Sequence, residues 1–234
     1  KGKQYLWEEL YEERKNDGYD DPTVLNLEEG ERRLKICSES IDKLAVKYDE
    51  VKPDVAIICG NDQHELFVED IQPAFTVIGA EILENMPRTE QQNARLPPGI
   101  EISDHGHIPP EHMTFPGLPE LAKHVSVELS NNDFDLTYTT KIPQADPNKT
   151  ITSGMPHAFG FIYRNIMHDK PIPNLPLVIN TFFPPNRPSA RRCYEFGRQV
   201  GMAVQNWDKD ARVMVAASGG LSHFVIDEEF DHDF

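Results

Sequence analysis

The sequence predicts an α/β fold in a single domain, with a central mixed sheet and helices on both faces. Two observations predict it: short apolar runs of strand length recur along the chain, and the segments between them carry apolar residues at helical spacing. Strands that alternate with amphipathic helices are typical of this fold class. No internal repeat and no linker interrupts the 234 residues, so we expect one domain over 1–234.

The expected strands are short segments that end at turn residues. The run Val55–Cys59 is apolar throughout, which is typical of a strand buried on both faces of a sheet. Phe134, Leu136 and Tyr138 instead alternate with polar residues, as in a half-buried strand. The expected strands are 55–59, 75–80, 134–140, 175–183 and 213–217.

The expected helices show apolar residues at steps of three and four. In the segment 30–50 these residues form one stripe made of Leu34, Cys37, Ile41, Leu44, Ala45 and Tyr48. Similar spacing predicts helices at 118–129, 159–167 and 189–207. Residues 1–29 are polar and acidic, and they lack strand character.

The segment 87–119 breaks this regular pattern. It carries seven of the 19 prolines and three histidines, and it shows no sustained periodicity. A loop of this length inside a compact domain is usually functional or mobile. We therefore expect 87–119 to be an irregular, proline-rich lid over a pocket, or an arm that contacts another subunit.

The composition limits the partners and the cellular location that we expect for the protein. With 23 basic and 39 acidic residues the net charge is −16, which disfavours nucleic acid but leaves an anionic small molecule open. No apolar run approaches the length of a membrane span, and no secretory signal is visible. The three cysteines, Cys37, Cys59 and Cys193, are too scattered for a disulfide framework, so we expect a cytoplasmic protein with reduced thiols.

Three histidines that follow predicted strands are the candidate functional residues. His64, His157 and His223 each come after a different strand, His157 with a longer loop between. Ligands of open α/β sheets bind beyond the carboxyl ends of the strands, so we expect these side chains to face one cavity. Imidazole binds iron or zinc and titrates near neutral pH, which favours a metal or acid–base site. Taken singly, each histidine also has a plain interpretation as a loop or helix-capping residue.

Other motifs favour no competing chemistry. The segment Gly220–Phe224 lacks the closing glycine of a nucleophile elbow, and no dinucleotide-binding or P-loop fingerprint occurs. The cluster Asp104-His105-Gly106-His107, with His112 nearby, carries metal-binding side chains without thiolates. Because it lies in the proline-rich segment, we interpret this cluster as incidental.

In combination, four stretches resemble the class III extradiol ring-cleaving dioxygenases, the family typified by protocatechuate 4,5-dioxygenase catalytic subunits. "VMVAASGGLSH" at 213–223 is similar to the family's strand and GG-[LM]-S-H segment, and the acidic stretch at 226–231 to its I-[DN]-x-E-F-D segment. "VINTFFPPNRPSARRCYEFGRQV" at 178–200 resembles the family's strand, proline turn and helix. "PDVAIICGNDQHELF" at 53–67 resembles the segment with a metal-ligand histidine.

This resemblance implies a mononuclear Fe(II) site made by two histidines and one carboxylate. A catechol-type substrate would bind through both hydroxyls, with O2 at an open position. Carried over residue by residue, His64 matches a metal-ligand histidine and His223 the catalytic histidine beside the oxygen site. His157 matches a second pocket histidine that assists proton transfer.

The chain also departs from the family pattern. Family members place the ligand histidine directly after Asp, whereas here Gln63 follows Asp62 and His64 comes one residue later, so Gln63 and His64 compete for the ligand position. The family's first metal histidine normally lies in an N-terminal S-H-x-P segment, which does not occur here. Its carboxylate ligand normally lies well beyond the stretch at 226–231. We therefore expect a fragment that lacks both family termini.

The function implied by the resemblance is extradiol cleavage of a catechol-type ring, with insertion of both atoms of O2 beside the two hydroxyls. The ring substituents stay open among protocatechuate, gallate, an aminophenol and a longer substituted catechol. Two alternatives are a metal-free interaction protein of the same fold and a metal-dependent hydrolase that uses His64, His223 and Asp62. The expected partners are the aromatic substrate and O2, without nucleic acid or membrane, in a homo-oligomer or with a small second subunit.

Overall fold

A computed structural model describes residues 7–16, 26–96, 100–143 and 153–219 of the chain. Contacts divide the chain into two units, Lys1–Leu44 and Ala45–Phe234. The first unit contains α1 (Trp7–Asn16), which the sequence did not predict, and most of α2 (Leu27–Val51). Helix α2 confirms the helix predicted at 30–50. The second unit contains the described sheets and the candidate site.

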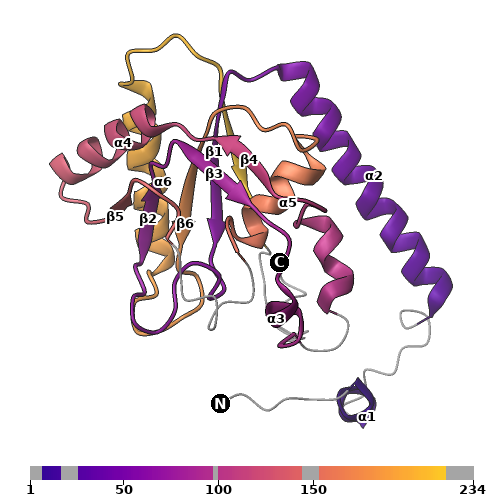
Figure 1. Cartoon of the computed structure of the whole chain (residues 1–234). Coiled ribbons are helices and arrows are strands. Elements are labelled where there is room, and N and C mark those ends of the chain that lie inside the picture. The colour runs from indigo at the N-terminus through magenta and orange to yellow at the C-terminus, as the bar shows by residue number, and fades with distance from the viewer. Residues whose placement is uncertain (1–6, 17–25, 97–99, 144–152, 220–234) are drawn as a thin grey trace. The chain divides into compact units, whose positions relative to one another are not determined.

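Five strands form a mixed sheet in the second unit, in the order β5-β2-β6-β1-β7 (Figure 1). Strand β1 (Val55–Asn61) lies between β6 (Asn174–Ile179) and β7 (Val213–Ala217) and runs parallel to both. Strand β2 (Phe75–Ile78) is antiparallel to β6 and parallel to β5 (Thr137–Thr139). All five predicted strand regions therefore contribute to one sheet, and the predicted mixed α/β class is confirmed.

Strand β5 is shorter than the alternating pattern at 134–140 predicted. Phe134 precedes it and is 1% exposed. Its ring lies edge-on to Phe75, with centroids 5.2 Å apart, and 5.6 Å from the ring of Phe196. Its backbone N–H donates to the carbonyl of Leu129 at the end of the preceding helix. Phe134 thus anchors a turn in the core, and only the residues after it pair with β2.

Helices cover both faces of the five-stranded sheet. They are α4 (Pro119–Asn131), α5 (His157–Asn165) and α6 (Ala190–Gln205), which confirm the three helices predicted in this unit. Figure 1 shows α4 and α6 together on one side of the sheet and α5 on the other. Ile57 of β1 packs in the core formed with α4 and α6, whereas a side chain on Gly60 would contact Ala158 and Phe159 of α5. Alternate residues of one buried strand therefore face the two layers, as the two-residue period of a strand requires.

The proline-rich segment contains short regular elements where irregular structure was predicted. They are α3 (Glu90–Asn93), the 3₁₀ helix η1 (Ile100–Gly106) and β4 (Met113–Pro116). Strand β4 pairs in an antiparallel two-stranded sheet with β3 (Ile82–Asn85). Elements of four to seven residues are too short to establish a period, so the sequence pattern missed them. The role of 87–119 as a lid or contact arm stays a prediction.

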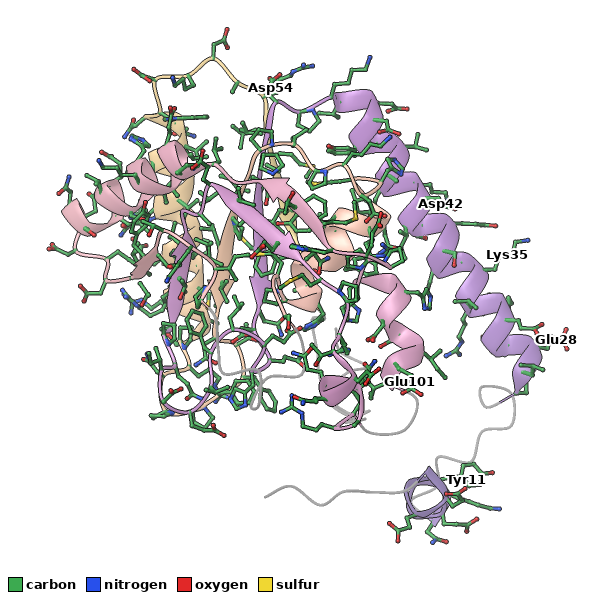
Figure 2. All side chains as sticks on the ribbon, viewed as in Figure 1. Tyr11, Glu28, Lys35, Asp42, Asp54 and Glu101 are labelled. Carbon is green, nitrogen blue, oxygen red and sulfur yellow. The ribbon has the colours of Figure 1, made fainter. Side chains whose placement is uncertain are left out.

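Asp54 marks the amino end of β1, opposite to the end where the candidate residues follow the strand. Figure 2 shows Asp54 at the upper end of the sheet, and its Oδ2 atom accepts a hydrogen bond of 2.8 Å from the backbone N–H of Arg212. This contact joins the start of β1 to the residue before β7. Across the described ranges, we find no helix with the length and apolarity needed to span a bilayer.

Candidate functional site

The loop that follows β1 is organised by the carboxylate of Asp62. Its Oδ1 atom accepts hydrogen bonds of 2.8 Å from the backbone N–H groups of Glu65 and Leu66. Its Oδ2 atom accepts one of 2.9 Å from Phe67. Asp62 is buried, and burial raises the pKa of its carboxyl group, while these N–H donors oppose that rise. His64 adopts φ 60° within this turn, in the left-handed region.

The side chain of His64 lies against residues that follow the neighbouring strand β6. Its ring stacks on Phe183 with the centroids 3.6 Å apart and the planes at 15°. Its Nε2 atom lies 3.2 Å from Nε2 of Gln72. A small surface cavity here is lined by Asp62, His64, Phe67, Gln72, Pro73, Val178, Asn180 and Phe183. The predicted metal-ligand histidine therefore borders a cavity at the end of the sheet where β1 and β6 finish.

The side chain of Glu65 points to different partners, at the start of α5. Its Oε1 atom accepts a 2.8 Å hydrogen bond from the backbone N–H of His157, and its Oε2 atom lies 2.7 Å from Nδ1 of the same residue. The Glu65 carboxylate is only 2% exposed. Its hydrogen bond raises the pKa of the His157 imidazole, against the opposing effect of burial. A carboxylate at a helix N-terminus is also favoured by the helix dipole.

A second imidazole, His107, lies beside His157. The two rings meet edge to face, with centroids 6.0 Å apart and planes at 80°. Burial lowers the pKa of His107, although Asp104, whose Oδ1 atom lies 3.8 Å from His107 Nε2, opposes that change. Two neighbouring histidines thus have pKa values shifted in opposite directions. Neighbouring titratable groups with oppositely shifted pKa values are a pattern that acid–base sites share.

The backbone around His107 is fixed against α5. The Nδ2 atom of Asn85 donates a 3.0 Å hydrogen bond to the His107 carbonyl, and this carbonyl also lies against Gly160. Arg88 binds Asp104 through two hydrogen bonds of 2.9 Å. The interpretation of the histidine cluster at 104–107 as incidental stays a prediction, although the fold places His107 next to a predicted site residue.

The opposite pKa shifts predict opposite effects of pH on stability. The folded-state pKa of His157 is raised, so its contribution to the free energy of unfolding is full below its ordinary value of 6.5 and is lost as the pH rises through the folded pKa. For His107, with a lowered folded pKa, the contribution is present above 6.5 and is lost as the pH falls. Denaturant unfolding of wild type, His157→Gln and His107→Gln between about pH 5 and about pH 8 measures both.

We expect the destabilisation caused by His157→Gln to shrink as the pH rises, and that caused by His107→Gln to grow. His112→Gln is the control, because His112 pairs with Glu84 on the surface, 51% exposed and with the two groups 3.2 Å apart. Parallel pH profiles for all three variants would contradict the prediction.

The route by which His157 reaches the site differs from the predicted one. Strand β5 runs opposite to β1, so its carboxyl end lies at the other edge of the sheet. His157 is placed instead by contacts of the preceding residues with β3. Gly154 forms an antiparallel β-bridge with Asn85, and the N–H of Met155 donates a 2.7 Å hydrogen bond to the carbonyl of Glu84. The strands before His64 and His157 therefore do not end on the same side of the sheet, and a cavity shared by the three histidines stays a prediction.

His223 lies outside the described residues. Strand β7 ends at Ala217, and the N–H of Ser218 then donates a 2.9 Å hydrogen bond to the carbonyl of Cys59 in β1. This contact places the end of β7 beside the strand that leads into the loop of His64 and Glu65. The role of His223 stays a prediction.

The described residues do not form a complete three-ligand metal site. Among them, no group of three or more His, Cys, Asp or Glu side chains is arranged to hold a metal ion. His64 supplies one imidazole, which contacts the Phe183 ring and the Gln72 amide. The carboxylate of Asp62 lines the same cavity, but its oxygens accept hydrogen bonds from backbone N–H groups. The described part of the chain therefore offers one candidate ligand for the iron that the resemblance implies.

The fold and these contacts define a mixed α/β protein in which buried carboxylates and histidines gather around the loop after β1 and the start of α5. More narrowly, residues 21–233 match the family described as the catalytic LigB subunit of aromatic ring-opening dioxygenase. Since this match covers most of the chain, the protein belongs to that family, as the sequence motifs implied.

Two curated relatives are similar to parts of the chain. A gallate dioxygenase of Pseudomonas putida is 25% identical over 127 residues, which cover 53% of this chain and 34% of the relative. A 2,3-dihydroxyphenylpropionate/2,3-dihydroxicinnamic acid 1,2-dioxygenase of Xanthobacter autotrophicus is 31% identical over 117 residues, 48% of this chain and 33% of the relative. The chain therefore aligns with about a third of the length of each relative.

Proposed function

We propose that this chain is part of the catalytic subunit of an Fe(II)-dependent extradiol dioxygenase, which opens a catechol-type ring with O2 and inserts both oxygen atoms. The observation that supports this proposal most strongly is the family match over residues 21–233. The names of both relatives add that they act on hydroxylated aromatic acids. A cytoplasmic location, and assembly as a homo-oligomer or with a small second subunit, belong to the same proposal.

Bound Fe(II) would supply the path by which electrons pass from the ring to O2. In this proposal His64 is one of its ligands, and the remaining ligands lie outside the described residues. His157 exchanges a proton with a substrate hydroxyl, for which its pKa, raised by Glu65, is suited. His223 acts as the second acid–base residue, beside the position of O2.

Oxygen consumption by the full-length protein tests this function. The protein is purified and loaded with Fe(II) without air, its iron content is measured, and O2 uptake is followed with protocatechuate, gallate, an aminophenol and a longer substituted catechol. We expect O2 uptake together with a yellow ring-opened product for at least one compound. Protein that holds iron but consumes no O2 with any of them would contradict the proposal. Protein that holds no iron after loading would favour the metal-free interaction protein.

A further inference from the structure

The carboxylate of Glu65 binds one residue at two points. One oxygen accepts the backbone N–H of His157 at 2.8 Å, and the other lies 2.7 Å from Nδ1 of its ring. A carboxylate that is only 2% exposed is costly unless its charge is compensated. Both oxygens of Glu65 are compensated by the same histidine, so its burial depends on that residue.

This two-point contact fixes the direction of the His157 ring. The backbone contact sets where α5 begins, and the side-chain contact sets the rotation of the imidazole. With Nδ1 donating to the carboxylate, Nε2 is the ring nitrogen that can exchange a proton with a ligand. The arrangement is the one in which a carboxylate fixes the tautomer of an acid–base histidine.

The other charged groups around His157 come from three further positions. Asp62 in the loop after β1 raises the pKa of His157, and Arg88, before α3, lowers it, both by charge. His107, from the end of the η1 segment, faces the ring edge to face at 6.0 Å. Glu65 is the group in direct contact with the ring nitrogen, and its hydrogen bond has the largest effect on the pKa of His157.

We propose that Glu65 is a positioning residue of the site, which holds the His157 ring so that Nε2 faces the aromatic substrate and exchanges a proton with its hydroxyl group. This inference rests on the proposed function. It adds a residue that neither the motif at 53–67 nor the resemblance assigned, since both pointed to the neighbouring His64. Glu65 acts through His157 and has no contact with the substrate in this proposal.

The test is Glu65→Gln in the full-length protein, which keeps the shape of the side chain and removes its charge. The first measurement is an NMR pH titration of the His157 imidazole, whose signal is assigned by its loss in His157→Gln. We expect the pKa of His157 to be lower in Glu65→Gln than in wild type. We also expect kcat to fall about 10- to 100-fold with KM nearly unchanged, as when a group that orients a catalytic side chain is lost.

Glu84→Gln is the matched control, because the Glu84 side chain also pairs with a histidine, His112, but on the surface, and the substitution keeps the backbone carbonyl that contacts Met155. We expect it to leave the pKa of His157 and the turnover unchanged. Glu65→Asp keeps the charge, and its His157 pKa should stay above that of Glu65→Gln. If Glu65→Gln does not fold, Glu65→Asp takes its place, and we expect a His157 pKa different from that of wild type because the shorter side chain alters the contact.

A His157 pKa that is the same in wild type and in the folded Glu65 variant would overturn the role of Glu65, whatever the activity of the protein. Loss of the raised pKa without any change in kcat, in a protein that opens aromatic rings, would also overturn it. A lower His157 pKa in a protein that consumes no O2 would instead contradict the proposed function and support the Glu65–His157 pairing alone.

Discussion

His223→Ala is expected to lower turnover about 10²- to 10⁴-fold while the iron content stays near that of wild type, the usual effect of losing a general acid–base group. We base this prediction on the sequence position of His223, which follows two glycines shortly after the end of β7. Gly219 adopts φ 146°, a conformation that side chains rarely allow, just after Ser218 joins the end of β7 to β1. The chain can therefore turn tightly at this edge of the sheet, where the candidate site begins.

His64→Ala should instead lower the iron content, and turnover should fall as a consequence. Metal analysis of both full-length variants, together with steady-state O2 uptake, separates the two roles. His112→Ala is the control, because this surface histidine should change neither quantity. If His223→Ala abolishes iron binding and His64→Ala preserves it, the two assignments are exchanged.

Gly160→Ala is expected to destabilise the protein by about 1–3 kcal/mol, the usual cost of overpacking a tight contact. A Cβ atom at this position would overlap with the carbonyl oxygen of His107 and approach Nδ2 of Asn85 to 3.2 Å. The backbone of His107 would have to move away from α5, which would also displace its ring from His157. Chemical denaturation measures the loss of stability, and the NMR signals of both histidines report the displacement.

Gly197→Ala is the matched control within α6. A Cβ atom there has no neighbour within 4 Å, so the substitution should instead raise stability, by up to about 1 kcal/mol, because alanine favours a helix over glycine. Equal effects of the two substitutions would show that the contact between α5 and His107 does not constrain the site.

The strands and helices follow largely from local pattern. Val55–Cys59 is a continuous apolar run because β1 lies between two strands and under helices on both faces. Strand β7 was predicted at its observed bounds, Val213–Ala217, and the helical spacing at 189–207 predicted α6. In each case the hydrophobic period of the segment reflects the environment of that segment alone, and for this reason it is readable from the sequence.

Only the tertiary structure reveals the direction of β5 and the pairing of the short strands β3 and β4. The pattern at 134–140 predicts a strand, but it contains nothing that decides whether β5 runs with or against β1, because side-chain alternation is the same in both. Strands β3 and β4 have four residues each and pair with one another across α3 and η1. Strands this short show no period of their own, so only the tertiary structure reveals their pairing.

The sequence by itself determined the α/β class, the family, and the candidacy of His64, His157 and His223. Only the tertiary structure placed Glu65 against His157, which lies 92 positions away along the chain, and His107 beside His157. Glu65 and His107 show no local signal, since a glutamate after a strand and a histidine in a proline-rich segment are ordinary surface residues by pattern. Their partners are distant in sequence: Glu65 contacts His157 at the start of α5, and the backbone of His107 lies against α5.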